Sequence, residues 1–541
     1  MTEARAGRLM LEEYRVTEAP ASHPSLLEAS ALAFGALLGL LGAVIGLELL
    51  TRVGIAPNTS VIGAVIAIAV SRIPLAVCRN YRSLDRQNLM QTVISAATFG
   101  SANALLLPLG VIWLFGAPHL VPAMFAGALA GMITDAAVLY RVFDTKVYPA
   151  GGTWPPGVAT AECLIAGDRG GKRAGLLGVG AAAGGIGRLF GLPMDIVGVC
   201  WIGNIWALTM FSLGLLATGY AERITGMQIQ SIYLPHGVMI GAGAVAILEI
   251  IRVIVRKSGG AAAENHCTRS ERDLGLALGS GLAAFVLIAV GLALLAGLYT
   301  DMSPGMLVAF VLFSAVAAMA SELIVGISAM HAGWFPAFAT ALIFLVLGMA
   351  LGFPPLALAF LVGYTASTGP AFADMGYDLK TGWIVRGSGR FRNFEMQGRR
   401  QQFFAALLGF GVAAVVVLFS YERYFSQNLF PPVDSVFVAT IRSAADPQIA
   451  GYLLMWAVPG AMIQWLGGPS RQLGILLATG LLIDNPVAGW TALLALAIRV
   501  ALLRRYGKAA ESPMYVLAGG LIAGSAVTSF GAATLQLRPR G

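Results

Sequence analysis

The amino-acid sequence predicts an all-α polytopic membrane protein, and its composition supplies the main evidence. Of the 541 residues, 57% are hydrophobic and only 11% are charged, and glycine occurs 67 times. Soluble domains carry about 25% charged residues, so this chain has too little charge to cover a water-exposed surface. Glycine lets helices approach closely in lipid, where the packing of small residues replaces the hydrophobic effect. The composition therefore excludes a soluble globular enzyme.

The chain contains enough apolar segments for about 14–16 transmembrane helices, because each crossing needs roughly 20 apolar residues. Some of these segments are interrupted, so we also expect broken or re-entrant helices. The apolar segments lie near residues 26–51, 59–78, 89–115, 119–141, 174–194, 197–220, 234–256, 273–299, 303–328, 335–352, 355–373, 402–421, 448–466, 470–487, 488–504 and 512–535.

Basic clusters between the apolar segments indicate which loops face the cytoplasm. Examples are residues 72–86, 141–173 and 386–400. Positive charge is typical of cytoplasmic loops, so the formal net charge of +8 does not indicate nucleic-acid binding. An odd number of segments separates Arg173 from Arg252, which makes 147–167 a candidate re-entrant segment. We expect a multi-pass protein of the inner (plasma) membrane, in contact with the lipid bilayer.

Sequence echoes predict two duplicated halves. LLATG occurs at 215–219 and 476–480, YLPHGVMIGAGAV (233–245) aligns with YVLAGGLIAGSAV (515–527), and ISAATFGSA (94–102) loosely matches YTASTGPAF (364–372). The copies keep the same order, as in transporters built from repeats with substrate bound at the repeat interface. The predicted divisions are a cytoplasmic tail (1–25), a first transmembrane half (26–256), a polar linker (257–272), a second half (273–535) and a C-terminal tail (536–541).

The first polar cluster opens the segment near 89–115. Asn88 and Gln91 are three residues apart, so their amides lie on one helical face, and Thr92 follows. Polar groups within a span are costly and usually face a cavity or one another. Asn88 and Gln91 are therefore candidate substrate-binding residues; the alternative is a helix start whose side chains cap the helix or reach the interface.

The second cluster is the stretch 147–167, VYPAGGTWPPGVATAECLIAG. Its prolines and glycines predict a broken helix, and irregular backbone at membrane depth is tolerated where it is buried in protein or lines a cavity. Tyr148, Trp154 and Thr160 are candidate substrate-binding residues, and Glu162 is a candidate for proton coupling. The alternative is a surface loop that leads into a helix, with Glu162 as an ordinary interfacial acid.

The third cluster, GMQIQSIYLPHGVMIGAG, places Gln228 and Tyr233 before His236 at the start of an apolar span. Gln228 and Tyr233 are candidate substrate-binding residues. Histidine titrates near neutral pH and suits proton coupling, although a lone buried histidine is more often structural.

The fourth cluster, YTASTGPAFADMGYDLKTGW, joins a predicted helix break to charged residues. Asp374 and Asp378 are four residues apart and share one helical face. They could bind a cation, a substrate ammonium group or a proton, or they could form a helix end paired with Lys380. Thr368, Asp374 and Lys380 are the candidate substrate-binding residues here, and Asp378 is a candidate for proton coupling.

Several signatures of other protein classes are missing from the sequence. There is no P-loop and no His-Glu-x-x-His motif, and there is no Thr-Val-Gly-Tyr-Gly filter. The four cysteines are widely separated, without the close spacing of a zinc or redox motif. We expect no cofactor, no metal site and no enzymatic activity.

The segments RQNLMQT, YPAGGTWPPGVATAE, YLPHGVMIGAG, GPAFADMGYDLKTGW and YVLAGGLIAGSAV together resemble the oligopeptide transporter family, which includes the yellow-stripe-like metal-chelate carriers. The resemblance extends from about residue 26 to 535 in the same order. The chain lacks the Asn-Pro-Gly and Lys-Ile-Pro-Pro-Arg motifs of the fungal and plant peptide branch, and GTWPP is an insertion in the Tyr-Pro element. It therefore looks closer to the bacterial and yellow-stripe-like side.

The resemblance implies a secondary transporter of small peptides or metal chelates, driven by protons. We expect a proton-coupled symporter that imports a short peptide or a related amino-acid-derived compound by alternating access. One alternative keeps the fold and changes the cargo to a metal–chelate complex; a remote one is a membrane enzyme or scaffold without transport. The expected partners are substrate, protons and lipid, and a homo-oligomer is left open.

Overall fold

The computed structural model describes residues 22–53, 59–257, 267–333, 337–443, 447–468 and 471–536. The expected C-terminal tail and most of the N-terminal tail and the polar linker lie outside these ranges. Within them the chain is helical, and its only β-type pairing is an isolated bridge between Phe143 and Tyr148. The predicted all-α polytopic membrane fold is confirmed.

The helices follow the predicted apolar segments closely. The first part of the chain forms α2 (Ala29–Glu48), α3 (Thr59–Ser71), α4 (Ala76–Arg79), α5 (Leu84–Phe99), α6 (Leu107–Phe115), α7 (Val121–Val142), α8 (Pro155–Arg169), α9 (Gly171–Leu189), α10 (Met194–Ile202), α11 (Ile205–Thr225) and α12 (Leu234–Lys257). The second part forms α13 (Glu271–Leu295), α14 (Pro304–Ala332), α15 (Ala337–Ala350), α16 (Pro355–Ser367), α17 (Pro370–Val385), α18 (Arg392–Ser426), α19 (Pro432–Ser443), α20 (Pro447–Gly467), α21 (Leu473–Leu481), α22 (Pro486–Tyr506) and α23 (Glu511–Gln536).

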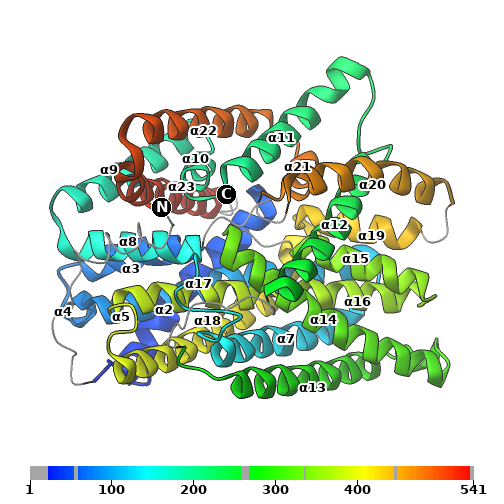
Figure 1. The fold of residues 1–541 in the computed structure, drawn as a ribbon, viewed down its shortest axis with the longest axis horizontal. Coiled ribbons are helices and arrows are strands. Elements are labelled where there is room, and N and C mark those ends of the chain that lie inside the picture. The colour runs from blue at the N-terminus through cyan, green and yellow to red at the C-terminus, as the bar shows by residue number, and fades with distance from the viewer. Residues whose placement is uncertain are drawn as a thin grey trace.

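Most of these helices lie along a common direction, with α13 at one edge of the molecule and α22 at the opposite edge (Figure 1). In the described part of the chain, eight helical segments are long and apolar enough to cross a membrane, and three shorter helices are also apolar. The predicted number of about 14–16 crossings is larger because it also counts short helices as crossings. It stays a prediction. The segment 147–167, a candidate re-entrant element, folds largely as α8.

Helix lengths recur in the same order in the two parts of the chain. Helices α9 to α12 contain 19, 9, 21 and 24 residues, and α20 to α23 contain 21, 9, 21 and 26. The aligned segments 233–245 and 515–527 lie in the N-terminal parts of α12 and α23. Helix α9 packs on α23, and α20 packs on α12. This recurrence is what a duplication with exchanged helices would produce, and the two halves with their boundaries stay a prediction.

Glycine makes these helix pairs possible. A Cβ atom at Gly241 on α12 would collide with the carbonyl oxygen of Ala457 on α20, and one at Gly180 on α9 would collide with that of Leu517 on α23. Because only a hydrogen fits at these positions, the backbones approach more closely than any other residue would allow. The high glycine content therefore has a direct packing role.

Two interrupted helices occupy the interior. Helix α5 passes through a π-helical turn (Gly100–Leu106) into α6, and α16 ends before an extended Thr368 and a left-handed Gly369 (φ 100°), after which α17 starts at Pro370. Helix α5 packs on α17 and α6 packs on α16, so the two interrupted helices run antiparallel. The matched segments 94–102 and 364–372 fall on the two interruptions.

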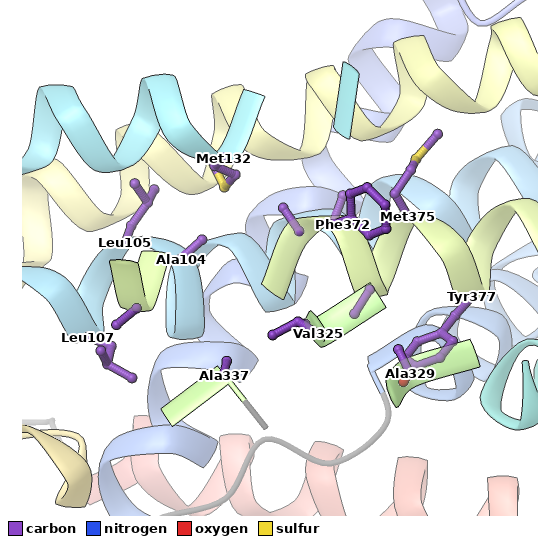
Figure 2. Packing of buried hydrophobic residues seen from close by; sticks show 14 of the residues in the cluster. Ala104, Leu105, Leu107, Met132, Val325, Ala329, Ala337, Phe372, Met375 and Tyr377 are labelled. Atoms are coloured by element: carbon purple, nitrogen blue, oxygen red, sulfur yellow. The ribbon is translucent and has the colours of Figure 1, made fainter. Parts of the chain in front are cut away.

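Buried apolar side chains surround the interruptions. Figure 2 shows Leu105 within the π-helical turn, Met132 on α7, Val325 on α14, and Phe372 and Tyr377 on α17. All but Tyr377, which is 5% exposed, are fully buried. Any polar group on the inward faces of these helices is therefore shielded from both lipid and water.

Candidate functional site

Two carboxylates on α17, Asp374 and Asp378, form the centre of the candidate site, and we call them the acid pair. They lie one helical turn apart and are 2% and 0% exposed. Ser95 Oγ and Thr59 Oγ1 donate hydrogen bonds to Asp374 Oδ1 over 2.8 and 3.1 Å. Ser60 Oγ donates to Asp378 Oδ1 over 2.9 Å. Hydroxyl groups from α3 and α5 therefore surround the acid pair.

The short hydroxyl side chains reach the acid pair because α3 and α5 lie very close together. A Cβ atom at Gly63, one turn after Thr59 and Ser60, would lie 2.7 Å from the carbonyl oxygen of Gln91. That distance is too short for a carbon–oxygen contact, so only glycine permits it. Gly63 thus sets the helix spacing on which the site depends.

The two amides predicted to share a helical face do so, and they connect to the acid pair. Gln91 Nε2 donates to Asp378 Oδ1 over 2.5 Å, and Asn88 Nδ2 donates to Gln91 Oε1 over 3.0 Å. Both side chains are fully buried. The structure therefore joins the first and fourth polar clusters of the sequence.

The acid pair has hydroxyl and amide partners but no basic partner. None of the salt bridges between described residues involves Asp374 or Asp378. Asp378 Oδ2 is buried and accepts no hydrogen bond from the described residues. An ionised carboxylate is costly in such surroundings, so these groups are suited to binding a proton.

A second buried cluster follows at the end of α17, and we call Asp144, Arg386, Glu395 and Arg399 the charged lattice. Arg386 Nε and Arg399 Nε each lie 2.7 Å from a Glu395 oxygen, and Arg399 Nη2 lies 3.0 Å from Asp144 Oδ2. Arg399 Nη1 also donates to Thr268 Oγ1 over 2.8 Å. Each charge in this lattice faces an opposite charge.

Polar side chains connect the acid pair to the charged lattice. Arg386 Nη1 donates to Asn88 Oδ1 over 3.4 Å and to Gln402 Oε1 over 2.9 Å. Gln402 Nε2 donates to the backbone oxygen of Asp378 over 2.7 Å and to Thr92 Oγ1 over 3.1 Å. A continuous set of buried polar contacts therefore runs along α17 from the acid pair to Arg386.

Lys380 does not pair with the acid pair, in contrast to the alternative that the sequence left open. Its Nζ donates to the backbone oxygen of Ala150 over 2.8 Å and lies 4.3 Å from the centre of the Trp383 ring. The side chain is 5% exposed. Lys380 thus holds the segment before α8 against α17.

Two predicted residues of the segment before α8, Tyr148 and Trp154, also pack against α17. The Trp154 indole ring occupies the space that a side chain at Gly376 would need. Tyr148 Oη donates to the backbone oxygen of Leu323 over 3.0 Å. The Thr160 hydroxyl donates to a backbone oxygen of its own helix over 2.8 Å. All three residues are buried, and their polar side-chain atoms donate to backbone oxygens.

Four predicted residues lie elsewhere. Glu162 accepts a hydrogen bond from Ser512 Oγ (2.9 Å), between α8 and α23. Gln228 is exposed and donates to Glu222. Tyr233 is half-buried and stacks edge-on with His236, whose Nδ1 has no hydrogen-bond partner among the described residues. The structure does not bring these four residues into contact with the acid pair.

A further buried acid pair, Asp135 on α7 and Glu322 on α14, lies at the interruption between α16 and α17, and we call it the break pair. Asp135 Oδ2 accepts a hydrogen bond from the backbone N–H of Gly369 over 2.6 Å, next to Thr368. Neither acid belongs to the four polar clusters of the sequence. A single acidic residue within a long apolar span is itself a functional signal in a membrane protein, and it could have identified both.

Sequence reasoning also missed the residues that complete the two clusters. Thr59, Ser60 and Ser95 are ordinary in an apolar helix, and only the packing of α3 on α5 shows their role. The sequence assigned the basic residues of 386–400 to a cytoplasmic loop, whereas Arg386 and Arg399 are 2% and 1% exposed. Their acidic partners come from positions 144 and 395, and the pairing with Asp144 cannot be seen without the fold.

In the ranges that the structure describes, no group of three or more His, Cys, Asp or Glu side chains could hold a metal ion.

Comparison with known proteins identifies the family. The family model for the OPT oligopeptide transporter protein matches residues 29–229 and 196–536. The chain belongs to the OPT oligopeptide transporter family. The resemblance seen in the sequence is thereby confirmed, and membership of OPT makes this protein a multi-pass membrane transporter of oligopeptides or related compounds. No curated protein matches the chain.

Proposed function

We propose that this OPT protein is a proton-coupled symporter of the plasma (inner) membrane that imports short peptides or peptide-like amino-acid derivatives by alternating access. The observation that carries the proposal is the acid pair. Asp374 and Asp378 are buried, face hydroxyl and amide groups, and form no salt bridge among the described residues. Intramembrane acids of this kind act as proton carriers in pumps and transporters.

The proposed proton step is a simple binding and release. A carboxylate oxygen of the acid pair takes up a proton from the outer aqueous phase and forms an O–H bond. The change from the outward-open to the inward-open state then costs less free energy, because the buried carboxyl group is neutral. On the cytoplasmic side the O–H bond breaks and the proton leaves.

The proposed substrate contacts come from the same region. The first turn of α17 begins at the interruption after Gly369, and helix N-termini attract negative groups such as a peptide carboxylate. The amides of Asn88 and Gln91 and the carboxylates of the acid pair are suited to a substrate amide or ammonium group. Binding would exchange the hydrogen bonds now made between these side chains for bonds to substrate.

The charged lattice is proposed to close the cytoplasmic side of this pathway. The positive-inside pattern assigns residues 386–400 to the cytoplasm, and the lattice joins the end of α17 and the start of α18 to Asp144 and Thr268. Movement of α17 toward an inward-open state would have to rearrange these ion pairs.

The test is proton flux into proteoliposomes, recorded with an internal pH dye while di- to tetrapeptides and, separately, iron chelates are added. We expect acidification with peptides. Acidification only with chelates would move the protein to the metal-chelate branch of the family. A lack of proton movement with transported substrate would overturn the proton coupling.

A further inference from the structure

The break pair lies at the interruption between α16 and α17. Asp135 on α7 binds the N–H of Gly369 (2.6 Å), which is the residue before α17. Glu322 on α14 follows Ser321, whose Oγ reaches the carbonyl oxygens of Thr365 and Thr368 at the end of α16 over 3.4 and 3.3 Å. The two acids thus approach the interruption from two different helices.

Most oxygen atoms of the break pair lack partners. Both side chains are fully buried. Asp135 Oδ1 and both Glu322 carboxylate oxygens accept no hydrogen bond from any described residue, and neither acid takes part in a salt bridge among those residues. The two carboxylates are close enough to interact electrostatically.

Among the described residues, two tyrosines are the other titratable groups that lie near the break pair. Tyr148 precedes α8 and lies near Glu322, and Tyr364 on α16 lies near both acids. Their hydroxyls donate to the backbone oxygens of Leu323 (3.0 Å) and Phe285 (3.3 Å). Among the described residues no Lys, Arg or His interacts with either acid, so no fixed positive charge balances the pair.

Two buried carboxylates without positive partners cannot both remain ionised at moderate cost. Three free oxygens are few for a hard metal cation, which takes six or more oxygen ligands in proteins. In the described residues the pair is also not part of a group of three potential metal ligands. A proton is the cation that needs only one oxygen.

We propose that Asp135 and Glu322 form a second proton-binding site, which is loaded and emptied as the interruption between α16 and α17 changes shape during transport. This inference rests on the proposed symport. A proton from the outer aqueous phase forms an O–H bond with one carboxylate oxygen, and the bond breaks when the proton leaves to the cytoplasm. An ionised Asp135 holds the Gly369 N–H and the N-terminus of α17 more strongly than a neutral one, which couples the proton to the position of α17.

The experiment compares Asp135→Asn and Glu322→Gln with wild-type protein. Each variant is a neutral isostere of one acid, so either variant alone decides the test if the other fails to fold. Asp434→Asn is the matched control, because Asp434 on α19 is also buried with both carboxylate oxygens unpartnered among the described residues, but it packs against Gly110 on α6.

The first readout is infrared spectroscopy of the purified full-length protein, which detects the C=O stretch of protonated carboxyl groups without any transport. We expect Glu322→Gln or Asp135→Asn to lose a protonated-carboxyl band that wild-type protein shows. A spectrum that keeps every such band in both variants would overturn the second proton site.

The second readout is the proton-to-substrate ratio, measured from reversal potentials in proteoliposomes. We expect this ratio to fall in Asp135→Asn and Glu322→Gln and to stay unchanged in Asp434→Asn. An unchanged ratio in both break-pair variants would overturn the inference while leaving symport through the acid pair intact. A wild-type protein that moves substrate without protons would instead overturn the proposed function, and the infrared band would then still decide whether the break pair binds a proton.

Discussion

The acid pair and the charged lattice are both buried polar clusters that involve α17, but they differ in how their charges are balanced. In the charged lattice, Glu395 lies 2.7 Å from both Arg386 and Arg399. In the acid pair, Asp374 and Asp378 meet hydroxyl and amide groups. A balanced cluster is stable in one charge state, whereas an unbalanced one can be occupied by a proton or left empty. This difference agrees with the proposal that the lattice closes the pathway and the acid pair couples protons.

The largest expected effect comes from unbalancing the lattice with Glu395→Gln. This change leaves Arg386 without its carboxylate, and removing one partner of a buried ion pair costs about 3–5 kcal/mol. The free energy of unfolding in detergent should fall by that amount. The control is Glu271→Gln, which breaks the exposed 2.6 Å ion pair with Lys146 and should leave stability unchanged. Equal losses in the two variants would contradict the account of the lattice.

The second prediction concerns His23, which docks before α2 against the start of α18. Its backbone N–H donates to Gln397 Oε1 over 3.1 Å, and burial together with the charge of Arg386 lowers the pKa of His23 to about 4. The folded state therefore favours the neutral ring, so its contribution is complete above pH 6.5 and is lost as the pH falls toward 4.

The loss should amount to at most about 3 kcal/mol, measured as unfolding free energy against pH. Glutamine does not titrate, so the free energy of unfolding of His23→Gln should lack this part of the pH dependence. An identical pH profile in wild type and variant would show that folding does not lower the pKa of His23.

The third prediction tests the helix spacing at the acid pair. Gly63→Ala places a methyl group 2.7 Å from the carbonyl oxygen of Gln91, which must push α3 away from α5 and cost about 1–3 kcal/mol. The control is Gly279→Ala on α13, where no atom lies within 4 Å; it should be neutral or stabilising by at most about 1 kcal/mol. If Gly63→Ala proves as stable as the control, the tight spacing is not required.

The smallest expected effect on stability is that of Asp378→Asn. No opposite charge loses its partner, and the amide oxygen can still accept hydrogen bonds from Ser60 and Gln91. Thermal unfolding should show a change within about 1 kcal/mol. A loss as large as that of Glu395→Gln would mean that a positive group balances the acid pair after all.

Much of the fold could be predicted from the sequence, because apolar segments mark helices directly. The interruption at Thr368–Gly369 was also visible in the Gly-Pro step of YTASTGPAF. The predicted segment near 89–115 covers most of α5 and all of α6 as one element, but the π-helical turn between them was not predicted, because such a turn leaves no clear sequence mark. Helix α19 was missed since its 12 residues include Asp434 and Arg442.

The candidate site was only partly predictable. Helical spacing correctly placed Asn88 with Gln91 and Asp374 with Asp378 on common faces, since such contacts are local. Glu162 and His236 were chosen for their chemistry alone, and they lie apart from the acid pair because nothing in the sequence specifies which helices meet. The partners of the lattice are likewise set by tertiary packing, as the contact between Arg399 and Asp144 shows.

Whether the acid pair carries the coupled proton can be decided by one experiment in proteoliposomes. Substrate uptake driven by an imposed proton gradient is measured beside substrate exchange without a gradient, for wild type, Asp374→Asn and Asp378→Asn. Both variants should lose most of the gradient-driven accumulation and retain exchange, because the proton of the acid pair no longer drives transport. Accumulation at the wild-type level in both variants would contradict this role of the acid pair.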